Sequence, residues 1–130
     1  MTKREGELKS ELFKLMNGIY PGFIVHQIAT AGFPDRAVTG RGKTTFWEFK
    51  HGTPEFDSIG LQELSCTRLA FVSFCRYVIW QETATEQRTL IVHPRDVKER
   101  TSWKVVPESF CLGFDLKWLV NQIVKEHGVR

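Results

Sequence analysis

Three strand-like segments follow one another between residues 23 and 50, and short turns separate them. The first segment, 23–28, is rich in β-branched and aromatic residues, which favour strands. A bend leads to a second segment at 36–39, and the two glycines in 40–43 can supply the positive φ angles of a hairpin turn into a third segment at 44–50. This pattern predicts that the second and third strands pair as a hairpin.

Helical patterns flank these strands on both sides. Apolar residues at helical spacing predict a helix over 7–20, and a second helix is expected over 59–71. The rest of the chain predicts two more strands and a last helix, at 75–81, at 88–93 and between Asp115 and Gly128. The stretch 95–113 matches neither the spacing of apolar residues in a helix nor their alternation in a strand. The order α-β-β-β-α-β-β-α predicts an α/β fold in which helices cover a central sheet.

The composition is that of one ordinary globular domain. The chain has 130 residues, of which 42% are hydrophobic and 25% are charged, so we expect a single domain over 1–130. No apolar run approaches the roughly 20 residues that span a bilayer, and the N-terminus is charged rather than apolar. The three cysteines lack a CxxC pair, which argues against a disulfide framework or a thiolate zinc site. We expect a cytoplasmic (intracellular) protein with no membrane partner and no small-molecule cofactor.

Positive charge slightly exceeds negative charge. Eighteen Lys and Arg against fifteen Asp and Glu give a formal charge of +3, which permits a polyanionic partner without requiring one. The basic residues gather in two stretches, and solvated loops are the simplest interpretation of both. In the second stretch a tryptophan stands among basic residues, and such a loop can stack on unpaired bases. The candidate nucleic-acid-binding residues are therefore Arg36, Arg41, Lys43, Arg100, Trp103 and Lys104.

Two acidic residues fall at the same expected end of the hairpin. Asp35 precedes the second strand and Glu48 lies near the end of the third, so pairing through the turn brings them level. Because side chains alternate along a strand, Glu48 and Lys50 share one face while Phe49 points to the other. Two neighbouring carboxylates repel, and Mg²⁺ removes that conflict because it binds oxygen ligands. Lys50 could then hold the attacking water or stabilise charge on a phosphate.

The run from Pro34-Asp35 through twelve residues to Glu48-Phe49-Lys50 resembles the PD-(D/E)XK nuclease superfamily. Gln62 matches a glutamine that several branches carry in the following helix. The pattern is similar to that of small stand-alone members, the VRR-NUC domains and the archaeal-type Holliday-junction resolvases. The resemblance implies a single-domain restriction-endonuclease-like fold with a central mixed sheet. Its α-β-β-β-α-β core would cover about 6–81, and 82–130 would complete the fold with a strand and a helix.

The resemblance also implies roles for individual residues. Asp35 and Glu48 would bind the metal together with the backbone carbonyl of Phe49. Lys50 would orient or activate the water, and Gln62 would steady the site or touch a phosphate. The implied cofactor is Mg²⁺, with Mn²⁺ able to replace it.

The family also tends to place a glutamate of the first helix near the metal. Glu11 lies among the apolar positions of the helix that we expect to face the core, and we predict that it fills this role, with Glu7 in reserve. The chain departs from both branches: His26-Gln27 stands where VRR-NUC domains have an arginine, and Thr30-Ala31 where resolvases have Ser-Gly.

The function implied by the resemblance is that of a metal-dependent endonuclease that hydrolyses DNA phosphodiester bonds and leaves a 5′-phosphate. A four-way junction is one candidate substrate, and the sequence leaves DNA and RNA open. Cutting both strands needs two sites, so we expect a homodimer. Two alternatives stay open: a non-catalytic nucleic-acid-binding module on the same fold, and an α/β protein-interaction domain. The intact set of Asp35, Glu48 and Lys50 argues against the first alternative.

Overall fold

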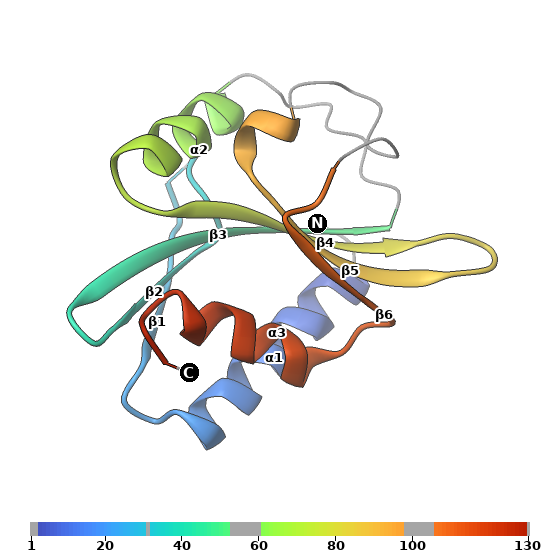
Figure 1. Ribbon diagram of the computed structural model, residues 1–130, viewed down its shortest axis with the longest axis horizontal. Helices are drawn as coiled ribbons and strands as arrows, with labels where there is room; N and C mark the ends of the chain where they lie inside the picture. The colour runs from blue at the N-terminus through green and yellow to red at the C-terminus, as the bar shows by residue number, and fades with distance from the viewer. Residues whose placement is uncertain (1–2, 31, 53–60, 98–105, 130) are drawn as a thin grey trace.

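The computed structural model describes residues 3–30, 32–52, 61–97 and 106–129, the side chains of 61–64 and 97 excepted (Figure 1). The chain forms these elements in order: α1 (Lys3–Ile19), β1 (Ile24–Gln27), β2 (Arg36–Gly40), β3 (Lys43–Gly52), α2 (Leu61–Val72), β4 (Cys75–Glu82), β5 (Gln87–Val92), the 3₁₀ helix η1 (Pro94–Val97), β6 (Ser109–Leu112) and α3 (Leu116–Lys125). The predicted order of helices and strands is confirmed, with η1 and β6 added.

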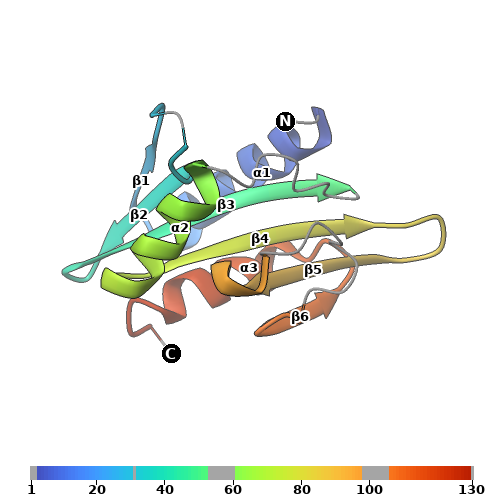
Figure 2. The same ribbon diagram turned by 90° about the horizontal axis from the view of Figure 1, so that it is seen from above.

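The strands form one mixed sheet in the order β1-β2-β3-β4-β5-β6. Within it β3 and β4 are parallel, because α2 crosses over between them, and the other neighbouring pairs are antiparallel. Figure 1 shows α2 on one face of the sheet and α1 and α3 on the other, and Figure 2 shows α2 lying over β3 and β4. The protein is thus an α/β fold built as a single small domain.

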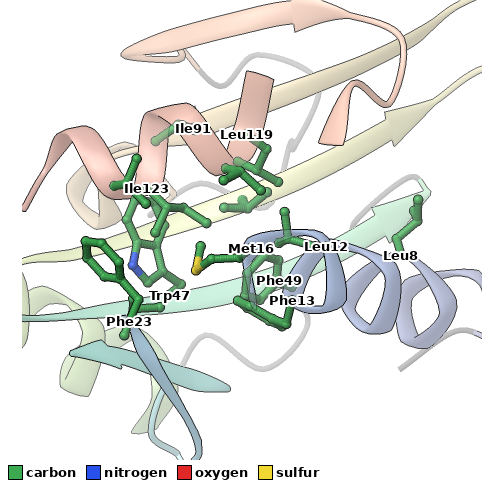
Figure 3. Close-up of a cluster of buried hydrophobic side chains, with 14 of the residues drawn as sticks. Leu8, Leu12, Phe13, Met16, Phe23, Trp47, Phe49, Ile91, Leu119 and Ile123 are labelled. Carbon is green, nitrogen blue, oxygen red and sulfur yellow. The ribbon is translucent and has the colours of Figure 1, made fainter. Parts of the chain in front are cut away.

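The main hydrophobic core fills the space between the sheet and the two helices α1 and α3 (Figure 3). Phe49 of β3 lies at its centre, stacked on Trp80 with ring centroids 5.3 Å apart and meeting the edge of Phe13 at 5.7 Å. A smaller cluster lies under α2 and includes Tyr77 and Ile79 of β4. Alternate residues of β4 therefore enter different clusters, and the strand is buried on both faces.

Strand β6 lies in the stretch that the sequence pattern left unassigned. It has four residues and pairs with β5 at the edge of the sheet. Phe110 and Leu112, its large apolar residues, are 54% and 71% exposed, so its apolar positions do not mark the buried face. A short edge strand of this kind gives no usable pattern. In the described parts of the chain, no helix has both the length and the apolar character needed to cross a membrane.

Gly40, the last residue of β2, packs directly beneath the ring of Phe23. A Cβ atom at this position would lie 2.4 Å from a ring carbon, and the ring also makes an edge contact with His127, with ring centroids 5.1 Å apart. We expect Gly40→Ala to lower the free energy of unfolding by about 1–3 kcal/mol, because the ring has to shift. Gly18→Ala is the matched control, since no heavy atom lies within 4 Å of a Cβ there. Urea denaturation measures both, and equal stabilities would contradict this packing.

Candidate active site

The β2–β3 hairpin brings Asp35 and Glu48 together. Arg36 pairs with Trp47 in the ladder, so Asp35, one residue earlier, lies level with Glu48. The backbone N–H of Asp35 donates a hydrogen bond to Oε1 of Glu48 over 3.1 Å. The backbone N–H of Phe49 donates to Oδ2 of Asp35 over 3.2 Å. The prediction that both carboxylates lie at the same end of the hairpin is confirmed.

Glu48 is buried, with 2% of its surface exposed. Burial, in the first place, and the neighbouring charge of Asp35 together raise the pKa of its carboxyl to about 9. The ammonium of Lys50 acts in the opposite direction, with Nζ 3.8 Å from Oε2 of Glu48. Lys50 therefore shares a face with Glu48, while Phe49 points into the core, as the alternation along the strand predicted. A buried carboxyl with a strongly raised pKa beside a second acid is typical of functional sites.

Helix α1 contributes a lysine that the sequence did not predict. Nζ of Lys9 lies 3.4 Å from Oδ2 of Asp35 and 3.5 Å from Oε2 of Glu5. Both Lys9 and Glu5 are buried, with side chains 5% and 7% exposed. The acidic residue of α1 nearest the candidate site is therefore Glu5, which reaches Asp35 through the ammonium of Lys9.

The expectation that Glu11 faces the core is wrong. Glu11 is exposed, and Glu7, the reserve candidate, is exposed too and pairs with Arg4 at 3.4 Å. The buried residues of α1 are Glu5, Leu8, Lys9, Leu12, Phe13 and Met16. Because each residue turns a helix by about 100°, Glu11 lies more than a quarter turn away from Leu12. Leu15, the apolar position that extends the predicted stripe towards Glu11, is only half-buried.

Helix α2 covers the face of β3 that carries Glu48. Gln62 lies in the first turn of α2, and its side chain is outside the described residues. One turn later Cys66 is buried and hydrogen-bonded to the thiol of Cys75. That hydrogen bond and burial raise the pKa of Cys75, and burial raises the pKa of Tyr77, so both groups stay neutral beside Glu48.

The predicted nucleic-acid-binding residues lie in different places. The guanidinium of Arg36 donates to the carbonyl oxygen of Asp35 over 3.0 Å and lies over the ring of Phe13 at 5.9 Å. Arg41 and Lys43 stand at the hairpin turn, about 16 Å from Asp35 along the five residues of β2. The structure therefore brings Arg36 to the candidate site and leaves Arg41 and Lys43 at the opposite end of the hairpin. Arg100, Trp103 and Lys104 lie outside the described residues.

Asp35 and Glu48 fit a hard divalent cation. Their oxygens are the ligands that Mg²⁺ prefers, and a cation between them would offset the repulsion that contributes to the raised pKa of Glu48. Among the described residues no group of three or more His, Cys, Asp or Glu side chains could hold a metal ion. The donor set would therefore be two carboxylates completed by water or substrate oxygens, which suits Mg²⁺ because it keeps several waters. The carbonyl of Phe49 as a further ligand stays a prediction.

The raised pKa of Glu48 predicts how stability changes with pH in metal-free protein. The folded state holds a proton on Glu48 up to about pH 9, whereas an unfolded chain releases it near the ordinary value of 4.5. Between these limits the folded state binds more protons, so the free energy of unfolding falls as pH rises, by at most about 1.4 kcal/mol per pH unit. Urea denaturation in EDTA at several pH values measures this slope. Glu48→Gln should flatten it, and an unchanged slope in that variant would rule out Glu48 as the cause.

Comparison with models of known protein families gives no match, and a search of curated proteins gives no match either. The chemistry of the site is therefore inferred from its own residues. Those residues are a pair of acids at a strand end, of which Glu48 is buried and Asp35 half-buried, a lysine two residues further along the same strand, and a second lysine from α1.

Proposed function

We propose that this protein is a divalent-metal-dependent endonuclease of the PD-(D/E)XK type that hydrolyses phosphodiester bonds in DNA. The observation that carries the proposal is the placement of buried Glu48 against Asp35, with Lys50 beside it on the same face. A buried acid beside a second acid is costly unless a cation compensates it, and a lysine next to such a cation is suited to phosphate chemistry.

The arrangement of the elements supports a restriction-endonuclease-like fold. The order α1-β1-β2-β3-α2-β4, with β3 and β4 parallel, matches the α-β-β-β-α-β core that the sequence resemblance implies. The remaining elements from β5 onward extend the sheet and add α3 to the face already covered by α1.

In the proposed reaction Asp35 and Glu48 hold Mg²⁺, and Mn²⁺ can replace it. The bound ion supplies a water of lowered pKa and polarises a phosphoryl oxygen. Lys50 orients that water or neutralises charge on the phosphate. Its side chain is 29% exposed, so the ammonium can contact either group. Gln62 keeps its proposed role of steadying the site. The proposed assembly is a homodimer, which provides one site for each strand.

A protein-interaction domain is the second candidate. The observation in its favour is the apolar exposed face of the edge strand β6, where Phe110 and Leu112 point to solvent. This surface lies at the β6 edge of the sheet, whereas β2 lies near the opposite edge. An interaction at this surface does not explain the burial of Glu48.

A cleavage assay tests the proposed function. Supercoiled plasmid, linear duplex, single strands and a four-way junction are incubated with wild type in Mg²⁺, in Mn²⁺ and in EDTA, with a single-stranded RNA added to decide between DNA and RNA. We expect cleavage that requires metal and is lost in Asp35→Asn, which keeps the size of the side chain. The preferred substrate then assigns the branch. No cleavage, or equal cleavage by the variant preparation, would overturn the catalytic proposal in favour of the binding module or the interaction domain.

A further inference from the structure

A groove lies beside the candidate active site, between α1 and the first two strands. Its volume is about 810 Å³. One wall is the face of α1 that carries Lys9, Ser10, Lys14 and Asn17, and the other wall carries Gln27 of β1 and Arg36 of β2. Gln27 and Arg36 are paired in the sheet, so the second wall is a continuous surface. Asp35 also lines the groove, which therefore reaches one of the two acids of the candidate site.

The length of the groove follows from the helix that forms its wall. The lining residues of α1 run from Gly6 to Asn17, and at 1.5 Å per residue they cover about 16 Å. Lys9 lies against Asp35, so the half of the groove formed by Lys14 and Asn17 extends away from the site. A nucleic-acid strand advances about 3.4 Å per nucleotide when stacked, so the groove has room for roughly five nucleotides.

The charges in the groove favour an anionic occupant. Lys9, Lys14 and Arg36 bring three cations, and Asp35 is the one acidic residue among the described lining residues. Lys14 is exposed along this wall. The guanidinium of Arg36 is fixed by its hydrogen bond to the carbonyl of Asp35. Cations held at defined positions beside neutral donors are the groups that bind phosphate oxygens.

The groove offers little for reading bases. Phe13 is the one aromatic residue among its described lining residues; it is 9% exposed, and the guanidinium of Arg36 lies over its ring. Proteins that stack bases use exposed aromatic side chains as platforms. Contacts here would fall on phosphates, which position a strand without specifying its sequence.

We infer that this groove holds one strand of the nucleic-acid substrate by its phosphates and leads it to Asp35 and Glu48. The inference rests on the proposed nuclease function and adds the path of the substrate. It assigns phosphate contacts to Lys14, on the side of α1, and to Arg36, and it predicts binding that is insensitive to sequence.

The test compares Lys14→Gln with Lys117→Gln, which removes the same charge from an exposed position of α3 outside the groove. Binding of fluorescent oligonucleotides, single-stranded and duplex and of several sequences, is measured in EDTA over a range of salt concentrations. We expect Lys14→Gln to weaken binding of all sequences by a similar factor and to lower the slope of log affinity against log salt by about 1. Lys117→Gln should match wild type in both respects.

Two results would overturn the inference in distinguishable ways. If wild type cleaves DNA with metal but the two lysine variants bind alike, the groove is not the path of the strand and the nuclease proposal stands. If wild type neither binds nor cleaves any nucleic acid, the inference falls together with the proposed function.

Discussion

Replacing Lys50 with methionine is expected to slow metal-dependent cleavage by about 10²–10³-fold, the range seen when one group that stabilises charge in a transition state is removed. Methionine keeps most of the aliphatic length of the side chain and loses the ammonium. That ammonium lies 3.8 Å from Oε2 of Glu48 and is partly open to solvent, so it can meet both the metal-bound water and a phosphate oxygen. Asp35 and Glu48 remain in place in this variant, and metal binding should survive.

Two measurements on the same preparations separate an effect on the cleavage rate from an effect on metal binding. Single-turnover cleavage gives the loss of rate, and the rise in melting temperature on adding Mn²⁺ reports whether the ion still binds. Lys117→Met is the control for removing an exposed lysine elsewhere. Cleavage by Lys50→Met at the wild-type rate would exclude Lys50 from the reaction, and a lost Mn²⁺ response would make it a structural part of the ion site.

The second large effect concerns stability. Lys9 lies between Glu5 and Asp35 at 3.5 and 3.4 Å, and its side chain is 5% exposed. We expect Lys9→Met to lower the free energy of unfolding of the metal-free protein by about 3–5 kcal/mol, because the variant leaves the buried Glu5 and the half-buried Asp35 without the ammonium they share. Adding Mn²⁺ should recover part of this loss, since a cation at Asp35 replaces some of the missing charge.

Urea denaturation of Lys9→Met, Glu5→Gln and the double variant measures the coupling. The double variant should be more stable than Lys9→Met alone, because the neutral amide at position 5 no longer requires a cation. If Lys9→Met lowers the free energy of unfolding by less than about 1 kcal/mol, the ion pairs of Lys9 are solvated and contribute little to stability, as exposed ion pairs do.

The meeting of Asp35 and Glu48 was predictable because it depends on local chain geometry. A hairpin with a short glycine-containing turn allows few registers, and the register places residues on either side of the turn level with each other. The same alternation predicted that Lys50 accompanies Glu48 and that Phe49 enters the core.

The contribution of α1 was not predictable from apolar spacing alone. Glu5 and Lys9 are four residues apart, and such a pair is usually a solvated one on a helix surface. A signal was present, because Glu5 and Lys9 continue the row that ends at Phe13 in steps of four residues. Leu8, Leu12 and Leu15 lie near Glu11 in the sequence and favour it, but the buried side of the helix passes through Leu8 and Leu12 and leaves Glu11 exposed.

The groove was missed for a different reason. Arg36, Arg41 and Lys43 are close along the chain, but the length of β2 separates Arg36 from the other two in space. Lys14 and Arg36 line the same groove only because α1 packs across the sheet. Contacts between distant segments of this kind require the tertiary structure.

The central claim is that Asp35 and Glu48 together form a site for a divalent cation. Calorimetric titration of metal-free protein with Mn²⁺ tests it most directly, with Asp35→Asn and Glu48→Gln as variants that keep the shape of each side chain. We predict saturable binding to wild type that is lost in both variants. The absence of binding to wild type, or equal binding to wild type and both variants, would contradict the claim.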